Sequence, residues 1–384
     1  MRATLIVLDS VGAGAMPDAP DWGDEGADTL GHVAETVGGL SLPNLQALGL
    51  GNLHVVLGVP PVGQPTAAYG RAAIASNGKD TIAGHWEMAG VPVSERFHEY
   101  PDGFPEEILA HFRRITGHDP LGNYARSGTV IIEELGVEHM ATGRPIVYTS
   151  SDSVFQVAAH EQVVPIEQLH AWCRAMFEAL EPYRIARVIA RPFLGEPGSF
   201  WRTDNRYDYA LEPHDKTVVD TLRETEWPTT SIGKIKSIFG DRGFSAAIKA
   251  GGNEALTQAI IDQLDTQKSG LIFANLVDFD MKYGHRRNPV GYAAALEAFD
   301  ARVPDILAKM GEDDLLLMTA DHGCDPTHPG SDHTREFVPI LAWRKNGMAQ
   351  NLGDRDTMAD MAATMAEFFG VEAPPSGKSF LEQV

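Results

Sequence analysis

Three apolar segments that are far apart in the chain each end in acidic or histidine residues. The segments are "RATLIVLD", ending at Asp9, "GLIFANLVDFD", ending at Asp278 and Asp280, and "DLLLMTADH", ending at Asp321 and His322. Runs of apolar, β-compatible residues are typical of strands buried on both faces of a parallel sheet. Ligands of such sheets bind beyond the carboxyl ends of the strands. The pattern therefore predicts an α/β protein with its functional residues at one sheet edge.

Helical segments, in which apolar residues recur every three or four positions, separate these strands. The clearest cover residues 253–264, 291–310 and 356–369, and "FVPILAW" is a further candidate strand. Strands that alternate with helices predict a mostly parallel sheet covered by helices on both faces.

The middle of the chain has a different pattern. Residues 97–211 contain short candidate strands ("RPIVYTS", "ARVIARPF") and helices over 105–115 and 166–180, punctuated by Gly, Pro and Asn. We expect a smaller α+β cap domain here, inserted into a core formed by residues 1–96 and 212–384. A cap that closes over a sheet edge would make a site from which water is excluded.

Composition narrows the class of protein. The chain has 384 residues, which favours two domains, and a formal net charge of -22, which argues against nucleic-acid or anionic-membrane partners. A small phosphorylated substrate is still compatible, because bound divalent cations reverse the local field. No apolar run is long enough to span a membrane, and the first residues do not form a signal peptide. With only Cys173 and Cys324, both expected to be free thiols, we predict a cytoplasmic protein without an obligatory protein partner.

The strand ends and two nearby motifs, "DFDMKYGH" and "TADHGCDPTHPGSDHTRE", supply a mixed set of oxygen and nitrogen ligands. Any one of these residues alone would more commonly be structural. Together they suit Mn, Zn or Mg, and they are too many for one open catalytic metal but divide between two. The candidate ligands are Asp9, Asp280, His285, Asp321, His322 and His333.

A two-metal site also needs a nucleophile, and "SNGKDTIAGHWEM" offers Thr81 in a Gly-punctuated loop. Coordination to a dication lowers the pKa of a hydroxyl enough for attack on phosphorus. If Thr81 begins a helix, backbone N–H groups there would hold phosphate oxygens. Thr81 could instead be a helix N-cap, and Ser76 is a competing hydroxyl; the spacing alone does not decide between them.

Five longer strings resemble the prokaryotic phosphopentomutases of the alkaline-phosphatase superfamily. They are "VLDSVGAGAMPDA", "NGKDTIAGHWE", "YTSSDSVFQVAAHE", "NLVDFDMKYGHRRNPVGYAAALEAFD" and "TADHGCDPTHPGSDHTRE". The resemblance runs from the first strand to the last helix and includes the insertion. The Asp-His motif alone indicates only the superfamily, whereas its combination with "KDTIAGHWE" and "YTSSDSVFQ" is more specific. The resemblance implies an alkaline-phosphatase-like core with an inserted cap.

The resemblance also implies roles for the site residues. Thr81 would carry the phosphoryl group, and the usual metal of the family is Mn2+. One metal would be held by Asp9, Asp321 and His322, and the second by Asp280, His285 and His333. Cys324 stands where a small polar residue is expected.

Substrate contacts follow from the same resemblance. Ser150 and Asp152 match cap residues that contact ribose hydroxyls. Basic residues near the substrate are matched by Arg187, Arg202 and Lys234, although Arg191, Arg206 and Lys236 are close enough in sequence to be confused with them.

The implied activity is that of an isomerase. It would interconvert ribose 1-phosphate and ribose 5-phosphate, and the 2-deoxyribose phosphates, through a phosphothreonine and a 1,5-bisphosphate, in nucleoside and pentose phosphate catabolism. A sugar bisphosphate would prime the enzyme as an activator. The alternatives are a phosphatase or phosphodiesterase of the same superfamily, a cofactor-independent phosphoglycerate mutase, and a metal-binding regulatory protein without turnover.

Overall fold

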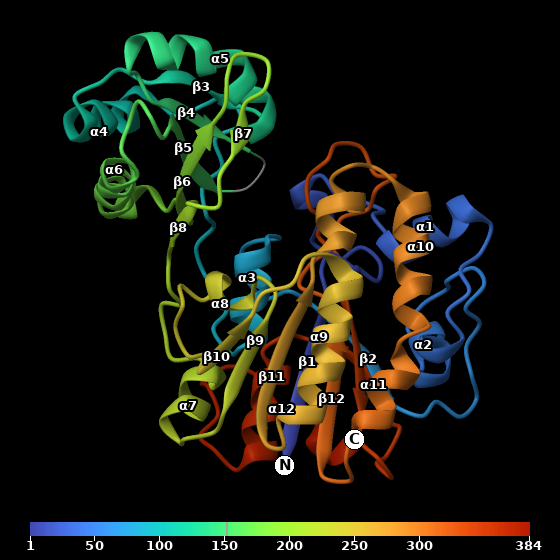
Figure 1. Cartoon of the computed structure of the whole chain (residues 1–384). Helices are drawn as coiled ribbons and strands as arrows, with labels where there is room; N and C mark the ends of the chain where they lie inside the picture. The colour runs from blue at the N-terminus through green and yellow to red at the C-terminus, as the bar shows by residue number, and fades with distance from the viewer. Residues whose placement is uncertain (151–152) are drawn as a thin grey trace. The chain divides into compact units, whose positions relative to one another are not determined.

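The computed structural model describes residues 1–150 and 153–384, and they form two compact units (Figure 1). Unit 1 consists of Met1–Glu95 and Glu212–Val384, and unit 2 consists of Arg96–Leu211.

Unit 1 is built on an eight-stranded sheet with the strand order β10-β9-β11-β1-β12-β13-β2-β14. Its strands are β1 (Arg2–Leu8), β2 (Ala68–Ala72), β9 (Thr229–Ile232), β10 (Ala246–Ile248), β11 (Gly270–Leu276), β12 (Asp314–Thr319), β13 (Val338–Trp343) and β14 (Asn351–Arg355). β13 pairs antiparallel with both of its neighbours, and the other pairs in this sheet are parallel. The expected mostly parallel sheet is confirmed, and "FVPILAW" is the strand that runs against the rest.

The centre of the sheet determines where the site forms. β1 lies between β11 and β12, and every residue of these three strands is buried. Leu8 pairs with Leu276 and Val7 with Thr319, so the three parallel strands end at nearly the same level. Residues that follow these strands therefore meet at one edge of the sheet, as the sequence pattern predicts.

Helices cover both faces of the unit 1 sheet (Figure 1). α9, α10 and α11 pack together on one face, and α12 packs with α3 and α7 on the other (Figure 1). The helices are α1 (Thr29–Val37), α2 (Pro43–Leu48), α3 (Thr81–Met88), α7 (Val218–Glu224), α8 (Ile235–Ile238), α9 (Gly252–Thr266), α10 (Pro289–Asp300), α11 (Val303–Lys309) and α12 (Asp360–Phe369). Shorter turns are η1 (Ala19–Trp22), η2 (Leu50–Asn52), the π-helical η4 (Phe279–Gly284) and η5 (Leu381–Gln383).

One expected helix is wrong. The sequence predicts a single helix over 291–310, but the chain forms α10 and α11 with a break at Ala301 and Arg302. Pro304 lies in the first turn of α11. Proline has no N–H to donate to the preceding turn and its ring clashes with that turn, so it is tolerated at a helix start and not in a helix interior.

Unit 2 contains a six-stranded sheet with the order β3-β4-β5-β6-β7 and with β8 paired to β6. The strands are β3 (Leu121–Ala125), β4 (Ile146–Thr149), β5 (Val154–His160), β6 (Arg187–Leu194), β7 (Trp201–Arg202) and β8 (Tyr207–Ala210). The helices are α4 (Glu106–Thr116), α5 (Gly128–Thr142), α6 (Ile166–Ala179) and the short η3 (Glu181–Tyr183).

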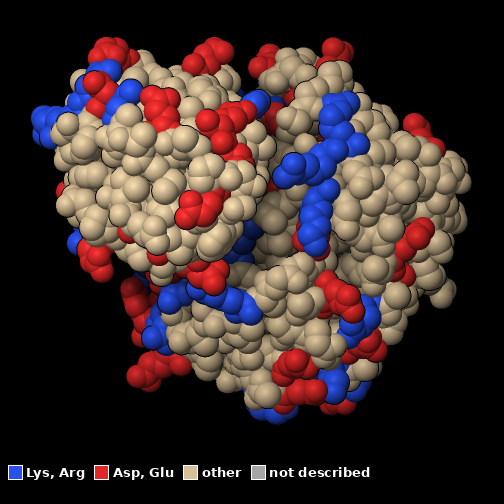
Figure 2. All heavy atoms as spheres, turned by 45° about the horizontal axis from the view of Figure 1, so that its top comes forward, with Lys and Arg blue, Asp and Glu red and all other residues tan. Residues whose placement is uncertain are grey.

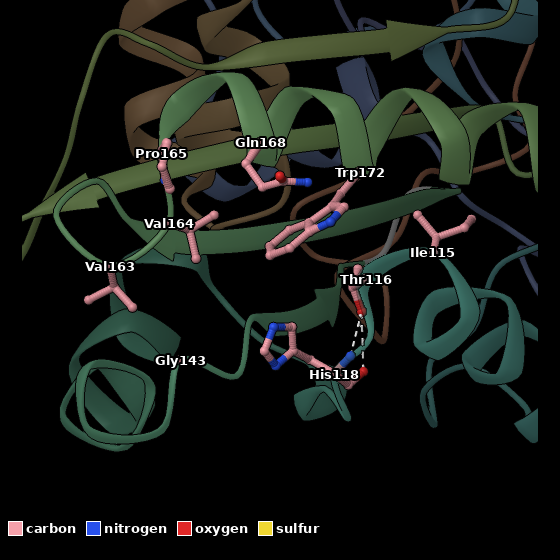
Figure 3. Close-up of a pocket in the computed structure, with 9 residues that line it drawn as sticks. All are labelled: Ile115, Thr116, His118, Gly143, Val163, Val164, Pro165, Gln168 and Trp172. Carbon is pink, nitrogen blue, oxygen red and sulfur yellow. Dashed lines mark hydrogen bonds between the residues drawn. The ribbon is translucent and has the colours of Figure 1, made fainter.

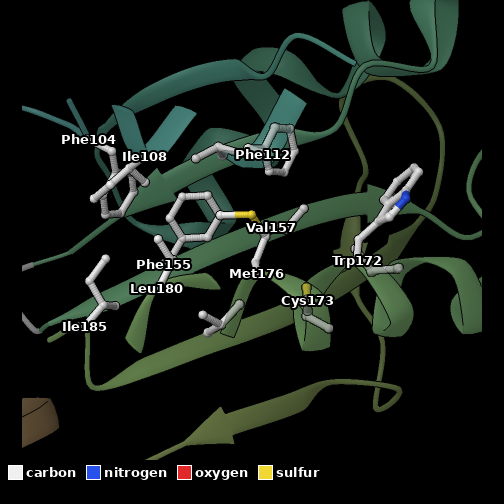
Figure 4. Packing of buried hydrophobic residues seen from close by; sticks show 14 of the residues in the cluster. Phe104, Ile108, Phe112, Phe155, Val157, Trp172, Cys173, Met176, Leu180 and Ile185 are labelled. Atoms are coloured by element: carbon white, nitrogen blue, oxygen red, sulfur yellow. The ribbon is translucent and has the colours of Figure 1, made fainter. Parts of the chain in front are cut away.

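Unit 2 has its own hydrophobic core (Figure 4). Phe155 on β5 lies among Phe104 and Phe112 and contributes ring contacts at centroid distances of 4.6 and 6.0 Å, with Met176 of α6 beside it (Figure 4). A second buried cluster joins Ile131 of α5 to the sheet. Full burial of such a side chain contributes about 1.5–3 kcal/mol.

The surface carries the acidic balance of the sequence. Figure 2 shows Asp and Glu side chains spread over the face in view, interspersed with Lys and Arg. Among residues 1–150 and 153–384, none of the helices combines the length and the apolarity that crossing a bilayer would need.

Candidate metal centre and active site

The first donor group lies at the ends of β1 and β12. Asp9, Asp321 and His322 each place one ligand-type atom within 4.8 Å of the others. His322 Nε2 lies 3.2 Å from Asp321 Oδ2 and 3.7 Å from Asp9 Oδ1. These three side chains are fully buried. Adjacent parallel strands thus deliver two carboxylates and an imidazole to one point.

The second donor group is centred on Asp280 in the π-helical turn η4. Its two carboxylate oxygens lie 3.3 Å from His285 Nε2 and 3.4 Å from His333 Nε2. His285 Nδ1 donates a hydrogen bond to Ser331 O at 2.6 Å, and this bond orients Nε2 toward Asp280. Such an outer hydrogen bond is typical of histidines that bind metals.

The two donor groups are neighbours, because His322 also lies within 4.8 Å of Asp280 and His333 through its ligand atom. The ring centroids of His322 and His333 are 3.9 Å apart, and those of His285 and His333 are 4.7 Å apart. The structure therefore brings together all six residues that the sequence offers as candidate ligands.

Several polar atoms in these groups are buried without a hydrogen bond from any described residue. They are Oδ1 and Oδ2 of Asp9, Oδ1 of Asp280, Oδ2 of Asp321 and Nε2 of His333. A buried carboxylate without a donor is costly unless a cation compensates its charge. The donor set of three carboxylates and three imidazoles therefore fits divalent cations of the Mn, Fe or Zn kind.

The pKa values of the clustered side chains in the absence of a cation also indicate a site for divalent cations. Burial, with the charges of Asp321 and Asp280, raises the pKa of Asp9 well above its ordinary value; the charge of Lys234 opposes this. Burial lowers the pKa of His285, but the hydrogen bond and charge of Asp280 outweigh it and raise the value to about 12. For His322, Asp321 outweighs burial in the same way and raises the pKa to about 10. Protons thus occupy a centre in which bound cations would replace them.

Thr81 is the first residue of α3, and its Oγ1 lies 3.3 Å from His322 Nε2. Gly84 makes this approach possible, since a Cβ at this position would lie 2.2 Å from Asp321 O. The helix N-cap is Asp80, which accepts hydrogen bonds from Ile82 N and Ala83 N. The N-cap alternative for Thr81 is therefore wrong. The expectation that N–H groups at this helix start would hold phosphate is also wrong for Ile82 and Ala83, because Asp80 already accepts their hydrogen bonds.

Ser76 has a structural environment. Its hydroxyl is buried and accepts a hydrogen bond from Val93 N at 2.9 Å, while its own N–H donates to Glu87 Oε2 at 2.7 Å. Of the two candidate hydroxyls, Thr81 is the one within hydrogen-bonding distance of the donor groups.

His85, which was not among the residues predicted from the sequence, is buried beside the centre. Its Nδ1 donates to Thr81 O at 2.8 Å and lies 3.3 Å from Asp321 Oδ2, and its Nε2 accepts from Asn275 Nδ2 at 3.0 Å. His85 follows Thr81 by four residues, so both occupy one face of α3. The four-residue spacing of Thr81 and His85 in "DTIAGHWE" is the sequence feature from which a role for His85 beside Thr81 could have been predicted.

The remaining predicted residues lie elsewhere in the chain. Lys234 is the N-cap of α8 in unit 1, where its charge reaches Asp9. In unit 2, Ser150 follows β4, and Asp152 lies outside the described residues. Arg187 begins β6, whereas Arg202 pairs with Phe193 near the end of that strand. Strand pairing therefore places the two arginines at opposite ends of β6.

Unit 2 also contains a pocket of roughly 450 Å³ (Figure 3). Its lining residues are Ile115, Thr116, His118, Gly143, Val163, Val164, Pro165, Gln168 and Trp172. The rings of His118 and Trp172 meet edge to face, with centroids 5.9 Å apart (Figure 3). None of the described residues predicted for the active site lines this pocket.

A further buried carboxylate, Glu336, holds the loops around the centre. Its oxygens accept hydrogen bonds from the Thr29 hydroxyl (2.7 Å) and N–H (2.8 Å), the Thr334 hydroxyl (2.6 Å) and Gly14 N (3.3 Å). Burial raises the pKa of Glu336 to about 7 despite these hydrogen bonds.

Glu336→Gln is therefore expected to change how stability depends on pH. Between the ordinary pKa of 4.5 and about 7, the folded state holds a proton on Glu336 that the unfolded state releases. The stabilisation is complete below the lower value and is lost as pH rises through the upper one, by roughly 3 kcal/mol in total. Urea unfolding with chelator at about pH 5 and about pH 7.5 measures it. Between these two pH values, the free energy of unfolding should fall less in Glu336→Gln than in wild type. An equal fall in both proteins would contradict the raised pKa of Glu336.

Comparisons with known proteins agree with this geometry. A model of the metalloenzyme superfamily matches residues 1–373. A phosphopentomutase from Anaeromyxobacter dehalogenans (strain 2CP-C) is 53% identical, covering 100% of this chain and 98% of the relative. One from Caldanaerobacter subterraneus subsp. tengcongensis is 51% identical, over 100% of this chain and 98% of the relative. The chain belongs to the phosphopentomutases of the metalloenzyme superfamily.

Membership of this family makes the chain a metal-dependent isomerase, and it confirms the resemblance found in the sequence. Among solved structures, the PH0037 protein from Pyrococcus horikoshii matches with a TM-score of 0.51 and 15% identity, over 96% of this chain and 97% of that chain. That likeness shows a shared fold alone. It agrees with the predicted alkaline-phosphatase-like α/β core, a mostly parallel sheet flanked by helices.

Proposed function

We propose that this chain interconverts ribose 1-phosphate and ribose 5-phosphate, and likewise the 2-deoxyribose phosphates. The observation that carries the proposal is the Thr81 hydroxyl beside two adjoining donor groups, in a chain about half identical to phosphopentomutases. A small phosphorylated pentose is the substrate, and the reaction would serve nucleoside and pentose phosphate catabolism in the cytoplasm.

Two divalent cations, in our proposal Mn2+, are held by the six clustered ligands. Asp9, Asp321 and His322 would hold one, and Asp280, His285 and His333 the other. A bound pair of cations lowers the pKa of a nearby hydroxyl and offsets the charge of phosphoryl oxygens. The orphaned carboxylate oxygens of Asp9, Asp280 and Asp321 support this assignment.

Thr81 is the residue that carries the phosphoryl group. The phosphorylated Oγ1 passes its phosphoryl group to the free hydroxyl of the pentose monophosphate, giving a 1,5-bisphosphate and a free threonine. After the sugar reorients, Thr81 takes the phosphoryl group from the other position and releases the isomeric monophosphate. A sugar bisphosphate primes the enzyme when Thr81 has lost its phosphate.

His85 positions this nucleophile. Its hydrogen bond to Thr81 O and its proximity to Asp321 tie the first turn of α3 to the first donor group. Asn275 holds the other ring nitrogen, so the imidazole stays in one orientation.

Sugar and phosphate contacts are proposed for residues matched in the sequence motifs. Ser150 and Asp152 would accept hydrogen bonds from ribose hydroxyls, whereas the phosphate would pair with Arg187, Arg202 and Lys234, because guanidinium and ammonium groups match a dianion. The charge of Lys234 acts on Asp9, which supports a place for Lys234 near the phosphate. Arg187 and Arg202 lie at opposite ends of β6, so we propose that the phosphate pairs with one of these two arginines at a time. This part of the proposal rests on the motifs.

The direct test is a product assay. Full-length protein with Mn2+, ribose 5-phosphate and a trace of ribose 1,5-bisphosphate should accumulate ribose 1-phosphate at constant total organic phosphate, followed by 31P NMR. Without the bisphosphate, ribose 1-phosphate should begin to accumulate only after a longer lag, because unphosphorylated Thr81 must first be primed. Release of inorganic phosphate without ribose 1-phosphate would reject the mutase in favour of a hydrolase.

A further inference from the structure

Cys324 places a thiol at the metal centre. Its Sγ lies within 4.8 Å of a ligand atom of Asp280 and of His285, so the three residues form a third group of the kind that holds metals. The cysteine follows β12 by a few residues and is almost completely buried. This position brings a soft sulfur donor into a set that otherwise offers only oxygen and nitrogen.

The packing around Cys324 keeps the thiol in this position. The backbone N–H of Cys324 donates to Thr29 Oγ1 at 3.2 Å, and Sγ makes a weak contact with Asp332 O at 3.7 Å. Gly284, one residue before His285, leaves room for the sulfur, because a Cβ there would lie 2.8 Å from Sγ. The side chain therefore has little freedom to turn away from Asp280 and His285.

A second observation points to a ligand at this position. Asp280 is 4% exposed, and its Oδ1 accepts no hydrogen bond from the described residues. His333 Nε2 lies 3.4 Å from this oxygen and is likewise buried without a hydrogen bond from the described residues, so a cation bound between the two atoms would satisfy both. Thiolates prefer soft cations, whereas carboxylates also suit harder ones such as Mn2+ and Mg2+.

We propose that Cys324 supplies a thiolate ligand when a soft divalent cation, Zn2+ or Cd2+, occupies the position at Asp280 and His285. The proposal deepens the metal site of the proposed function and rests on it. On binding, the S–H bond breaks, the proton passes to solvent, and the sulfur lone pair forms the bond to the cation. With Mn2+ the position is served by the oxygen and nitrogen donors.

This inference gives the chain a metal preference of its own. A site with Asp280, His285 and a thiolate matches the mixed oxygen, nitrogen and sulfur sets that Zn2+ accepts. Soft cations should therefore compete with Mn2+ for this position more strongly than they would at a site with a polar side chain at 324.

The test uses Cd2+ and the ultraviolet absorption of the thiolate-to-cadmium charge transfer. The full-length chain, stripped of metal with a chelator, is titrated with Cd2+ as wild type, Cys324→Ser and Cys173→Ser. Cys173 is the matched control, because it is a buried free thiol in the hydrophobic cluster of unit 2. Wild type and Cys173→Ser should develop the band, and Cys324→Ser should not, with an affinity for Cd2+ about 10–100-fold lower.

Two further variants test the thiolate assignment if Cys324→Ser does not fold. Cys324→Ala replaces Cys324→Ser if circular dichroism shows that the serine variant is unfolded, and His285→Asn should weaken the band because it removes a neighbouring ligand. A band that persists without Cys324, or a wild-type chain that binds Cd2+ without any band, would overturn the thiolate assignment. Mutase activity with Mn2+ is measured in parallel: its absence from a wild-type chain that shows the band would reject the proposed function alone.

Discussion

Thr81→Ala is expected to abolish phosphoryl transfer, lowering the rate of ribose phosphate interconversion by at least about 10⁴-fold. The reason is that Thr81 Oγ1, of the two candidate hydroxyls, lies within hydrogen-bonding distance of a donor group, at 3.3 Å from His322 Nε2. Metal content should change little, since six other side chains supply the clustered ligand atoms. A coupled assay measures the rate, and elemental analysis measures the bound metal.

The matched control is Ser76→Ala, which removes a hydroxyl from the same loop. Loss of the Ser76 hydroxyl removes the acceptor of the hydrogen bond from Val93 N. The variant should lose about 1 kcal/mol of stability but retain phosphoryl transfer. Peptide mass spectrometry of wild-type protein primed with the bisphosphate should find a phosphate on Thr81 and none on Ser76. Near-normal interconversion by Thr81→Ala would show that another group carries the phosphoryl.

The second large effect is expected for Asp321→Ala, which should lose a metal ion and lower activity by at least about 100-fold. Asp321 is fully buried, accepts a hydrogen bond from Ser10 N at 3.0 Å, and lies beside His85 and His322. Removing its carboxylate takes one negative charge from a centre of three. Metal stoichiometry per chain and activity at saturating Mn2+ are the measurements.

Asp325→Asn provides a control from the same loop. Asp325 is also buried, but it bonds to His32 and Thr327 and is outside the three donor groups. This variant should retain its metal. Burial alone would raise the pKa of Asp321, but the charges and hydrogen bonds of His322 and His85 lower it below its ordinary value. Without metal near neutral pH, Asp321→Asn should therefore be less stable than wild type, because the amide loses these interactions. Unchanged metal stoichiometry in Asp321→Ala would contradict the ligand assignment.

Local sequence patterns were enough to predict the core of the fold and the candidate ligands. A strand that is buried on both faces of a parallel sheet needs a run of apolar residues, so β1, β11 and β12 could be recognised from such runs in the sequence. The Asp residues that follow them had to meet, because parallel strands end at one edge. The break between α10 and α11 shows where such patterns fail: apolar spacing continues through Pro304, but the backbone cannot.

By itself, the sequence determined that carboxylates and imidazoles follow the buried strands β1, β11 and β12, because each run of apolar residues ends in Asp or His. Only the tertiary structure decided which hydroxyl joins them. The position of Thr81 depends on the close packing of Gly84 against Asp321, and its cap depends on Asp80. The contacts of His85 and Cys324 were decided in the same way, because distances between residues far apart in the chain are set by packing that no local pattern encodes.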